Sequence, residues 1–575
     1  MTASNRTDTA EWAPPGPGSW ICDRSHTSPG PTPFYRRVVS EYTEPTYREV
    51  MRRYGGALGS IDMQFVNGAM YRRLVPLVAP HLDRGKLPPR PVLWLLTRLH
   101  PEFRRRERTA AQILDDRSFL DDVRTWATSE RFVWIDRNRN LQAIDVTALD
   151  DAELAAHLRT LDAHLIEGWR RHHELHGNDL GPIGDLLAHV QGWGLDTTAV
   201  MGLLKGSSPA TADAAAHGAA IADALRDGGV DPSRAATVEE IRSVPAAAEA
   251  LDEYLDIFGW RLISDYDIEG LTLHELPAAI VALVRSSAGG PVENQPSDGA
   301  GNRSAEAEHE LRTAAGDPEL FDQLLASARE AYGVRDDNGP LTWAWPAGLL
   351  RRAYLEAGGR LAARDRIDEA AHAFELTIEE LAGALDGALR PSAAELIQRA
   401  EHRAWESTLH APDVLGPPPV EPDLRPLPPA IGRVMALVLA AVTMLDPEQR
   451  PAAIVAESEP APPVPELVGL GVGNRTYRGV ARVADDAARA IQEMQPGDVL
   501  VAPWTAPSFN AVLSIAGGVV VQEGGLLCHA AVMARELDIP AVVGCADAMS
   551  AIQSGDVVEI DAVAGRVTVA SARTP

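Results

Sequence analysis

The feature that most constrains the fold is a change in the residue pattern near residue 467. Beyond this point, short β-branched runs are bounded by Gly, Pro and Asp, at residues 497–503, 517–522, 541–545, 556–561 and 566–570. Runs of this kind are typical of β-strands. The segments 529–537 and 546–552, which lie between these runs, resemble short helices. The pattern therefore predicts a small C-terminal α/β domain of the β/β/α type over residues 467–575.

The part of the chain that precedes this domain has helical periodicity instead. After Asp151, larger side chains recur at helical spacing, at Leu154, His157, Leu158, Leu161, Leu165 and Trp169. We expect a large, mostly α-helical domain over residues 36–455, with a flexible loop at 286–305, where large apolar residues are absent. Residues 1–35 are rich in Pro, Gly and Ser and are expected to be irregular. The Pro-rich segment 456–466 is the expected hinge of this multidomain chain.

Bulk properties exclude several classes of protein. The 575 residues include 53 Lys and Arg against 81 Asp and Glu, a net charge of −28, which does not favour binding to nucleic acid or to an anionic membrane. The N-terminus has no apolar core of the signal-peptide type, and the longest apolar run, 434–445, falls short of the roughly 20 residues that a membrane span needs. Three cysteines match neither a disulfide framework nor a zinc pattern. We expect a cytoplasmic protein.

The segment around His529 carries the clearest chemical signal. A strand ends at Gly524-Gly525, and the chain then enters a helix whose first turn contains His529. The N-terminus of a helix presents free N–H groups and the positive end of the helix dipole, so it accepts an anion readily. An imidazole at this place can be a neutral nucleophile near pH 7. Without further context, a helix cap or a partly buried structural residue is the more frequent explanation of a histidine at such a place.

The residues on both sides of His529 supply that context. Residues 534–536 (ARE), 539–544 (IPAVVG) and 496–503 (PGDVLVAP) match a known pattern. Over about 467–572 the chain resembles the mobile phosphohistidine domain of the phosphoenolpyruvate-utilising family, which includes pyruvate phosphate dikinase, phosphoenolpyruvate synthase, rifampin phosphotransferase and phenylphosphate synthase. The resemblance implies that His529 carries a phosphoryl group.

The same resemblance implies that the phosphate site is supported by Gly524, Gly525, Cys528 and Arg535. The chain departs from the family pattern at two positions, because Leu527 stands in place of the threonine of the dikinases and Cys528 stands in place of Ser or Thr. We therefore expect no regulation through that threonine. Cys528 is expected to act as a weak donor or a small spacer, and a reactive thiol is the alternative.

A weaker resemblance extends into the helical part of the chain. Motifs at 203–206, 259–267, 345–352, 355–358 and 374–381 are similar to the helical regions of rifampin phosphotransferase and phenylphosphate synthase-like proteins. This resemblance implies that the helical domain binds the acceptor substrate. A transferring phosphoryl group is stabilised by cations, and the candidates are Lys205, Arg261, Arg351 and Arg352. Carboxylates that could accept the proton of the acceptor hydroxyl are Asp265, Asp267 and Glu356. Ordinary surface ion pairs are the alternative for each of these side chains.

The sequence shows no nucleotide-binding motif. The stretch 205–208 has the wrong glycine spacing for a phosphate loop, and no βα repeat suggests a phosphoenolpyruvate-binding barrel. We expect ATP and Mg²⁺ to act through a separate ATP-grasp protein, an arrangement for which phenylphosphate synthase is a precedent by resemblance. His172 and His176 lie one turn apart on one helix, but their spacing to Glu174 is not that of a zinc protease, and we expect no metal site.

The predicted function is therefore that of a phosphotransferase component, a kinase-type transferase. His529 would carry the phosphoryl group from the ATP-grasp partner to a hydroxyl of a small organic acceptor, with a phenol or another alcohol as the first expectation from the resemblance. Two alternatives remain open at this point. The phosphorylated alcohol could be an intermediate in a dehydration, or the chain could be a non-catalytic binding or regulatory protein that retains the fold.

Overall fold

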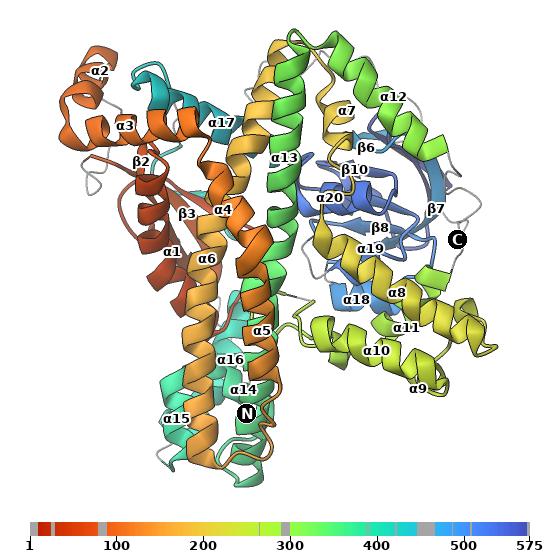
Figure 1. The fold of residues 1–575 in the computed structure, drawn as a ribbon. Helices are drawn as coiled ribbons and strands as arrows, with labels where there is room; N and C mark the ends of the chain where they lie inside the picture. Colours follow the sequence, from red (N-terminus) through yellow and green to blue (C-terminus); the bar gives the residue numbers. More distant parts are fainter. Residues whose placement is uncertain are drawn as a thin grey trace.

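The structure is a computed structural model, and it divides the chain into a long helical body and a compact C-terminal domain (Figure 1). The residues that it describes are 10–24, 29–78, 89–263, 265–288, 299–387, 390–419, 423–445, 466–485, 487–505 and 509–571. The helical body is the part up to Leu445, and the C-terminal domain is the part from Glu466. Most of the hinge segment predicted at 456–466 lies outside the described residues.

The helical body is built around α6 (Asp151–Gly192), a helix of 42 residues. Asp150 and Glu153 form a capping box at its start, in which each side chain accepts a hydrogen bond from the backbone N–H of the other. Four long helices pack along α6, namely α1 (Pro33–Arg53), α13 (Pro318–Gly339), α14 (Trp345–Ala363) and α17 (Pro429–Leu445). The approach of α17 is close, since a Cβ atom on Gly184 would lie 2.0 Å from the carbonyl oxygen of Leu437. The apolar periodicity of 151–175 is therefore confirmed as helical.

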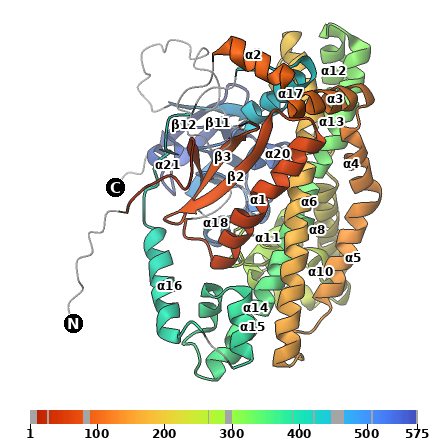
Figure 2. The same ribbon diagram turned by 90° about the vertical axis from the view of Figure 1, so that its left-hand side faces the viewer.

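The other described helices of the body lie on either side of this centre (Figures 1 and 2). They are α2 (Arg90–Leu99), α3 (Pro101–Asp116), α4 (Phe119–Thr125), α5 (Arg131–Gln142), α7 (Thr197–Gly202), α8 (Pro209–Asp227), α9 (Val238–Arg242), α10 (Pro245–Phe258), α11 (Pro277–Ala288), α12 (Gly299–Ala314), α15 (Ile378–Leu385) and α16 (Ala393–Glu406). Short π-helical or 3₁₀-helical turns occur at Trp126–Glu130, Pro232–Arg234, Leu273–Glu275, Pro340–Ala344 and Ala370–Glu375. Within the segment expected to be a flexible loop at 286–305, α11 ends and α12 begins.

The body also contains a small antiparallel sheet that the helical periodicity did not predict. Its strand order is β2 (Leu58–Val66), β3 (Ala69–Pro76), β1 (Trp20–Asp23) and β4 (Val414–Leu415). The hairpin between β2 and β3 turns at Asn67 and Gly68, which both have positive φ values. Asn-Gly is the preferred pair for such a two-residue turn, because both central positions need a left-handed backbone. The segment 1–35, expected to be irregular, thus contributes β1 and the first residues of α1.

The C-terminal domain contains an eight-stranded mixed sheet. The strand order is β5 (Glu466–Val468), β12 (Arg566–Ser571), β11 (Val557–Asp561), β7 (Thr476–Val483), β8 (Val499–Ala502), β9 (Gly518–Val521), β10 (Ala541–Val543) and β6 (Leu470–Val472). Its helices are α18 (Ala487–Glu493), α19 (Asn510–Leu513), α20 (His529–Glu536) and α21 (Ala548–Ala551). The strands β7, β8, β9 and β10 are parallel. All residues of β8, β9 and β10 are buried, as expected for parallel strands that are covered on both faces.

The two domains share one apolar core. Leu186, Val190 and Leu324 of the body belong to the same buried cluster as Val532 and Met533 of α20. The helix α11 of the body also packs against α18 and α19 of the C-terminal domain. In the part of the chain that the structure describes, no helix is long and apolar enough to pass through a lipid bilayer. The arrangement places the start of α20 at the boundary between the two domains.

Candidate active site at the domain interface

The turn between β9 and α20 fixes the position of His529. Gly524 has a φ of +108°, and a Cβ atom on it would lie 2.8 Å from the Sγ atom of Cys528, so the turn requires glycine at this position. Cys528 is the N-cap residue of α20 and has an extended backbone. His529 is therefore the first residue of the helix, where the backbone N–H groups have no acceptor within the helix.

Thr505 lies beside the His529 ring. Its Oγ1 atom is 3.0 Å from Nδ1 of His529. Thr505 follows the end of β8, and His529 follows the end of the neighbouring parallel strand β9. Because the carboxyl ends of parallel strands lie at the same edge of a sheet, this topology brings the two side chains together. A neutral imidazole that donates its Nδ1 proton to Thr505 carries its lone pair on Nε2, which is then the nucleophilic nitrogen.

Burial keeps His529 in its neutral form. The side chain is half-buried, and its desolvation lowers the pKa of His529 to about 3, well below the ordinary value near 6.5. At neutral pH the ring therefore carries no positive charge. A neutral ring with a positioned Nδ1 atom, at the positive end of a helix, is suited to accept a phosphoryl group on nitrogen.

The two other polar residues of this segment, Cys528 and Arg535, have supporting contacts. Burial raises the pKa of the Cys528 thiol, so the thiol stays protonated, and its Sγ atom packs against Gly524. This environment is that of a small spacer and not that of a reactive thiolate. The buried guanidinium of Arg535 donates to the carbonyl oxygen of Leu526 and lies 3.5 Å from the hydroxyl of Tyr332 on α13. Arg535 thus holds the turn before His529 and connects it to the helical body.

The wall of the helical body beside this turn is formed by α13, which carries Tyr332 and Arg335. Burial raises the pKa of both Cys528 and Tyr266, and the positive charge of Arg335 acts in the opposite direction on each. Arg335 lies one helical turn after Tyr332, the α13 residue that contacts Arg535. Arg335 was not among the residues singled out from the sequence.

Two charged residues at the end of β1 were not singled out from the sequence. The pKa of Arg24, which follows β1, is lowered by burial but raised more by Asp413 and other anions, among them Glu523 in the turn before α20. The charge of Asp23 raises the pKa of Tyr266 in addition to the effect of burial.

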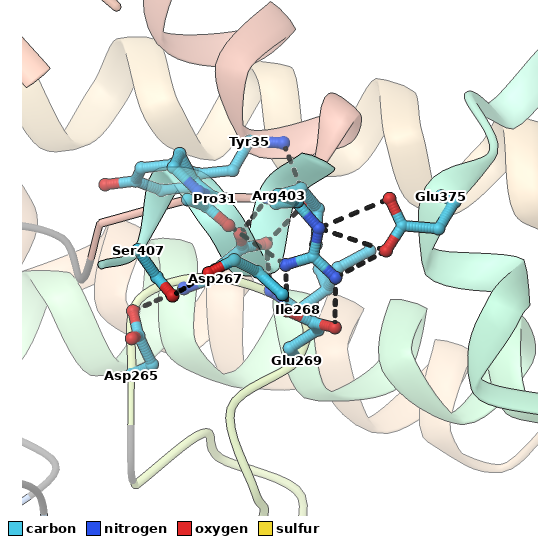
Figure 3. Close-up of polar contacts among 12 residues, drawn as sticks. Pro31, Tyr35, Asp265, Asp267, Ile268, Glu269, Glu375, Arg403 and Ser407 are labelled. Carbon is cyan, nitrogen blue, oxygen red and sulfur yellow. Dashed lines mark hydrogen bonds and ion pairs between the residues drawn. The ribbon is translucent and has the colours of Figure 1, made fainter. Parts of the chain in front are cut away.

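Asp265 and Asp267, both predicted as pocket residues, have different environments (Figure 3). Asp267 is buried and accepts hydrogen bonds from the backbone N–H of Thr32 at 2.6 Å and from its hydroxyl at 2.7 Å. Burial raises the pKa of Asp267 to about 7, against the effect of these hydrogen bonds. Thr32 also caps α1, so Asp267 holds the start of that helix. Asp265 is half-buried and accepts from the N–H of Asp267 at 3.1 Å.

Next to Asp267, an arginine cluster fixes the same loop. Arg403 of α16 donates to Glu375 and Glu269, each at 2.6 Å, and to the carbonyl oxygen of Gly30 at 3.0 Å (Figure 3). These contacts join α16, the loop 261–276 and the chain before α1. The position of Asp265 is therefore set by a network of buried and half-buried ion pairs.

The structure places three of the predicted pocket residues in the interior packing of the body. Arg351 donates to Glu275 at 2.8 Å and to the carbonyl oxygens of Ile268 and Glu269. Arg352 donates to the carbonyl oxygens of Gln142 and Ile144 and stacks over the ring of Trp260. Glu356 accepts from Arg360, one turn later on α14, at 2.7 Å. All three support the scaffold that carries the 261–276 loop.

Arg261 and Lys205 are also engaged, each in a different way. Arg261 donates to the carbonyl oxygen of Ile257 and stacks over Phe258, and burial lowers the pKa of its guanidinium to about 10. The Nζ atom of Lys205 lies 3.2 Å from Asp538, just beyond the C-terminal end of α20. Beside it, the N–H of Gly206 donates to the carboxylate of Glu536 at 3.0 Å. Lys205 therefore contacts the C-terminal domain at the end of α20 opposite to His529.

The histidines of α6 are part of the packing of the body. His172 is hydrogen-bonded to Asn338 of α13, and Nδ1 of His173 contacts the carbonyl oxygen of Trp169 at 2.7 Å. Over the described ranges, no group of three His, Cys, Asp or Glu side chains is arranged to hold a metal ion.

Comparison with known proteins identifies the class of this site. Residues 494–565, which contain His529, match the family model described as "PEP-utilising enzyme, mobile domain". Residues 210–336 of the helical body match the model described as "Rifampicin phosphotransferase fourth domain". The chain therefore carries a mobile domain of the PEP-utilising enzymes, and the resemblance drawn from residues 496–544 is confirmed.

Similar proteins add detail to this assignment. Phosphoenolpyruvate synthase of Pseudomonas aeruginosa is 41% identical over 97 residues, which are 17% of this chain and 12% of that protein. The uncharacterized phosphotransferase YvkC of Bacillus subtilis is 33% identical over 105 residues, 18% of this chain and 12% of that protein. Chondramide synthase cmdD of Chondromyces crocatus is 30% identical over 251 residues, 43% of this chain and 6% of that protein. The chain is related to the phosphotransferases of this family, and its matches span only a small part of each of these relatives.

Proposed function

We propose that this chain carries a phosphoryl group on Nε2 of His529 and transfers it to a hydroxyl group of a small organic acceptor bound to the helical body. The observation that carries the proposal is the state of His529 itself. Its ring is neutral because burial lowers its pKa to about 3, its Nδ1 atom is 3.0 Å from the hydroxyl of Thr505, and it begins a helix at the domain boundary.

The phosphoryl donor is ATP, bound to a separate ATP-grasp protein. This part of the proposal rests on the resemblance to phenylphosphate synthase, which is the precedent for such a division of the reaction. Mg²⁺ on that partner would neutralise charge on the phosphates of ATP. In the first step, Nε2 attacks the γ-phosphorus, the bond from this phosphorus to the β,γ-bridging oxygen breaks, and ADP leaves.

The second step takes place at the wall of the body that faces the His529 turn. The acceptor oxygen attacks the phosphorus, the P–N bond to His529 breaks, and the hydroxyl proton passes to a carboxylate. Asp265 is the candidate base, because it is half-buried beside Tyr266, whereas Asp267 is occupied by Thr32. Arg335, one helical turn after the Tyr332 that contacts Arg535, is the candidate cation for the transferring phosphoryl group.

The two steps require two positions of the mobile domain. In the structure, α20 packs against the body through Val532 and Met533, and this is the position for transfer to the acceptor. Phosphorylation by the partner needs a second position in which His529 is exposed. The predicted hinge at 456–466 would permit this movement, which then gates turnover.

The proposal is tested by intact-mass spectrometry of the chain after incubation with ATP, Mg²⁺ and a candidate ATP-grasp protein. We expect the acid-labile gain of one phosphoryl group, which is absent in His529→Ala. The matched control is His309→Ala, which removes an exposed histidine of α12 and leaves the gain unchanged. A gain that persists in His529→Ala would refute the assignment of the carrier. If no ATP-grasp protein of the same genome produces a gain, the chain is better described as a binding or regulatory protein.

The product formed from the acceptor is identified in the same reaction. Wild-type protein incubated with partner, ATP and a panel of phenols and alcohols is expected to yield a phosphate ester that is stable to mild acid. An alkene product with release of phosphate would identify the dehydration in place of the ester. Asp265→Asn is expected to retain the phosphohistidine and to slow its discharge by the acceptor, which separates the two steps.

A further inference from the structure

The helix α2 presents an apolar face to solvent. Val92, Trp94, Leu95 and Leu99 are exposed by 53%, 49%, 51% and 55%, and they are four of the nine large hydrophobic side chains that are exposed among the described residues. Val92, Leu95 and Leu99 follow one another at intervals of three and four residues. This is the spacing of the anchor residues of a helix that binds in the groove of another protein.

The opposite side of α2 is fixed to the body. Thr97 is buried, and its hydroxyl donates to the carbonyl oxygen of Pro426 at 2.8 Å. Arg98 donates to the same carbonyl oxygen at 3.0 Å, and its guanidinium lies 4.2 Å from the centre of the Trp94 ring. The exposed face is therefore held in place before any partner binds, which lowers the entropic cost of docking.

The helix that follows α2 carries exposed arginines in an otherwise acidic chain. Arg104, Arg105 and Arg108 of the adjoining helix α3 are exposed, while the whole chain has a net charge of −28. The surface thus fits an apolar groove with an acidic rim. An anionic membrane would be repelled by the acidic remainder of the chain. A second copy that docked α2 against α2 would bring the same arginines together.

The location of α2 indicates which partner binds to its exposed face. The adjoining helix α3 packs on α17, with Phe103, Ala110 and Ile431 in one apolar cluster. At the end of α17, Leu445, the chain leaves the body, and the mobile domain begins at Glu466. Both views show α2 and α3 at an outer edge of the molecule, beside α17 (Figures 1 and 2). A protein bound to α2 would therefore lie beside the base from which the mobile domain moves.

We propose that the exposed face of α2 is the docking surface for the protein that phosphorylates His529, an ATP-grasp protein with an acid-rimmed apolar groove. This inference rests on the proposed function, because it assigns a surface to the partner of that function. Leu95 is the central residue of this surface, because at 3.6 residues per turn it lies between Trp94 on one flank and Val92 and Leu99 on the other. Trp94, with Arg98 stacked on its ring, is the aromatic anchor at the edge of the surface.

The test compares Trp94→Ser/Leu95→Ser and Arg104→Glu/Arg105→Glu with the wild-type chain. Each ATP-grasp protein of the same genome is titrated against the chain with ATP and Mg²⁺, and the initial rate of phosphohistidine formation is measured. We expect the partner concentration at half-maximal rate to rise roughly tenfold or more in both variants, at an unchanged maximal rate. The matched control is Phe132→Ser, which removes a side chain of α5 that is exposed by 52% and leaves the titration unchanged.

The outcomes separate this inference from the proposed function. If the wild-type chain is phosphorylated and the α2 variants behave identically, the docking surface is refuted and the phosphohistidine function stands. If no ATP-grasp protein phosphorylates the wild-type chain, both proposals fail. Two results obtained without a partner protein would also refute the inference. One is a wild-type dimer that becomes monomeric in Trp94→Ser, and the other is binding to phosphatidylcholine–phosphatidylglycerol vesicles that the same variant loses.

Discussion

The Oγ1 atom of Thr505 lies 3.0 Å from the Nδ1 atom of His529, and the two residues come from the ends of adjacent parallel strands. The contact fixes the orientation of the ring and leaves Nε2 as the nitrogen that would carry the proposed phosphoryl group. When the Thr505 hydroxyl accepts a hydrogen bond from Nδ1, it favours the tautomer of His529 that carries its proton on Nδ1.

Thr505→Val removes the hydroxyl and keeps the shape of the side chain. Loss of one hydrogen bond of this kind costs about 1 kcal/mol, and we expect the rate of phosphohistidine formation to fall roughly fivefold. Thr505→Ser keeps an oxygen at the same position and is expected to retain most of the rate. Quenched-flow measurement of the acid-labile phosphate checks both variants. Equal rates in Thr505→Val and the wild type would show that the contact has no role in the reaction.

The burial of His529 makes docking of the mobile domain dependent on pH. In the docked state the pKa is about 3, whereas an exposed histidine has a pKa near 6.5. The docked state therefore favours the neutral ring, and above pH 6.5 protonation of the ring does not oppose docking. As the pH falls from 6.5 towards 3, the exposed ring becomes protonated, and the equilibrium constant for docking falls roughly tenfold for each pH unit.

Small-angle scattering between about pH 7.5 and about pH 5 measures this loss as an increase in the fraction of open molecules. His529→Gln cannot be protonated, and we expect its scattering to change less over the same range. An identical pH profile in the variant would assign the effect to other titrating groups.

Gly524→Ala is expected to disturb the turn before α20. The φ of +108° is unfavourable for a residue with a Cβ atom, and that atom would also approach Cys528 within 2.8 Å. Strain of this kind costs about 1–3 kcal/mol. Thermal unfolding followed by calorimetry should show a lower stability of the C-terminal domain. The control is Gly359→Ala in α14, where an added Cβ atom meets nothing within 4 Å, and this variant is expected to be neutral or slightly stabilising.

Lys205 and Asp538 are expected to contribute to docking and not to chemistry. The charged atoms of the pair lie 3.2 Å apart, and both side chains are nearly half exposed. The ion pair therefore contributes about 0.2–1 kcal/mol to docking. Lys205→Ala should weaken docking by a small factor, seen as faster hydrogen exchange in α20. The reversed pair Lys205→Asp/Asp538→Lys is expected to restore part of the protection. A large loss of phosphoryl transfer in Lys205→Ala with unchanged exchange would instead place Lys205 in the chemistry.

The sequence predicted the local parts of the site better than the parts that depend on topology. The turn at Gly524 and the helix from His529 follow from consecutive residues, so the pattern was sufficient to find them. Thr505 follows a predicted strand, yet its contact with His529 depends on β8 and β9 being neighbours. The same reason explains why Arg335 of α13 was not found.

The prediction for the helical body was less complete for two different reasons. The hairpin at Asn67-Gly68 was visible in the sequence, because this pair is a strong turn signal, and helical periodicity elsewhere obscured it. The pairing of β1 with β4 could not be predicted, because β4 contains only Val414 and Leu415. Arg351 was assigned to a pocket from its charge and its place in a resembling motif, whereas the Glu275 carboxylate and carbonyl acceptors occupy it in the structure.

The unbroken length of α6 has a mechanical consequence. At 1.5 Å per residue its 42 residues form a rod of about 63 Å, and α13, which carries Arg335, and α17, which ends at the base of the linker, both pack along it. In the proposed cycle, the wall that carries Arg335 and the end of α17 would act as one stator, and the mobile domain would be the rotor. A change in the packing along α6 would then shift both end positions of the rotor together.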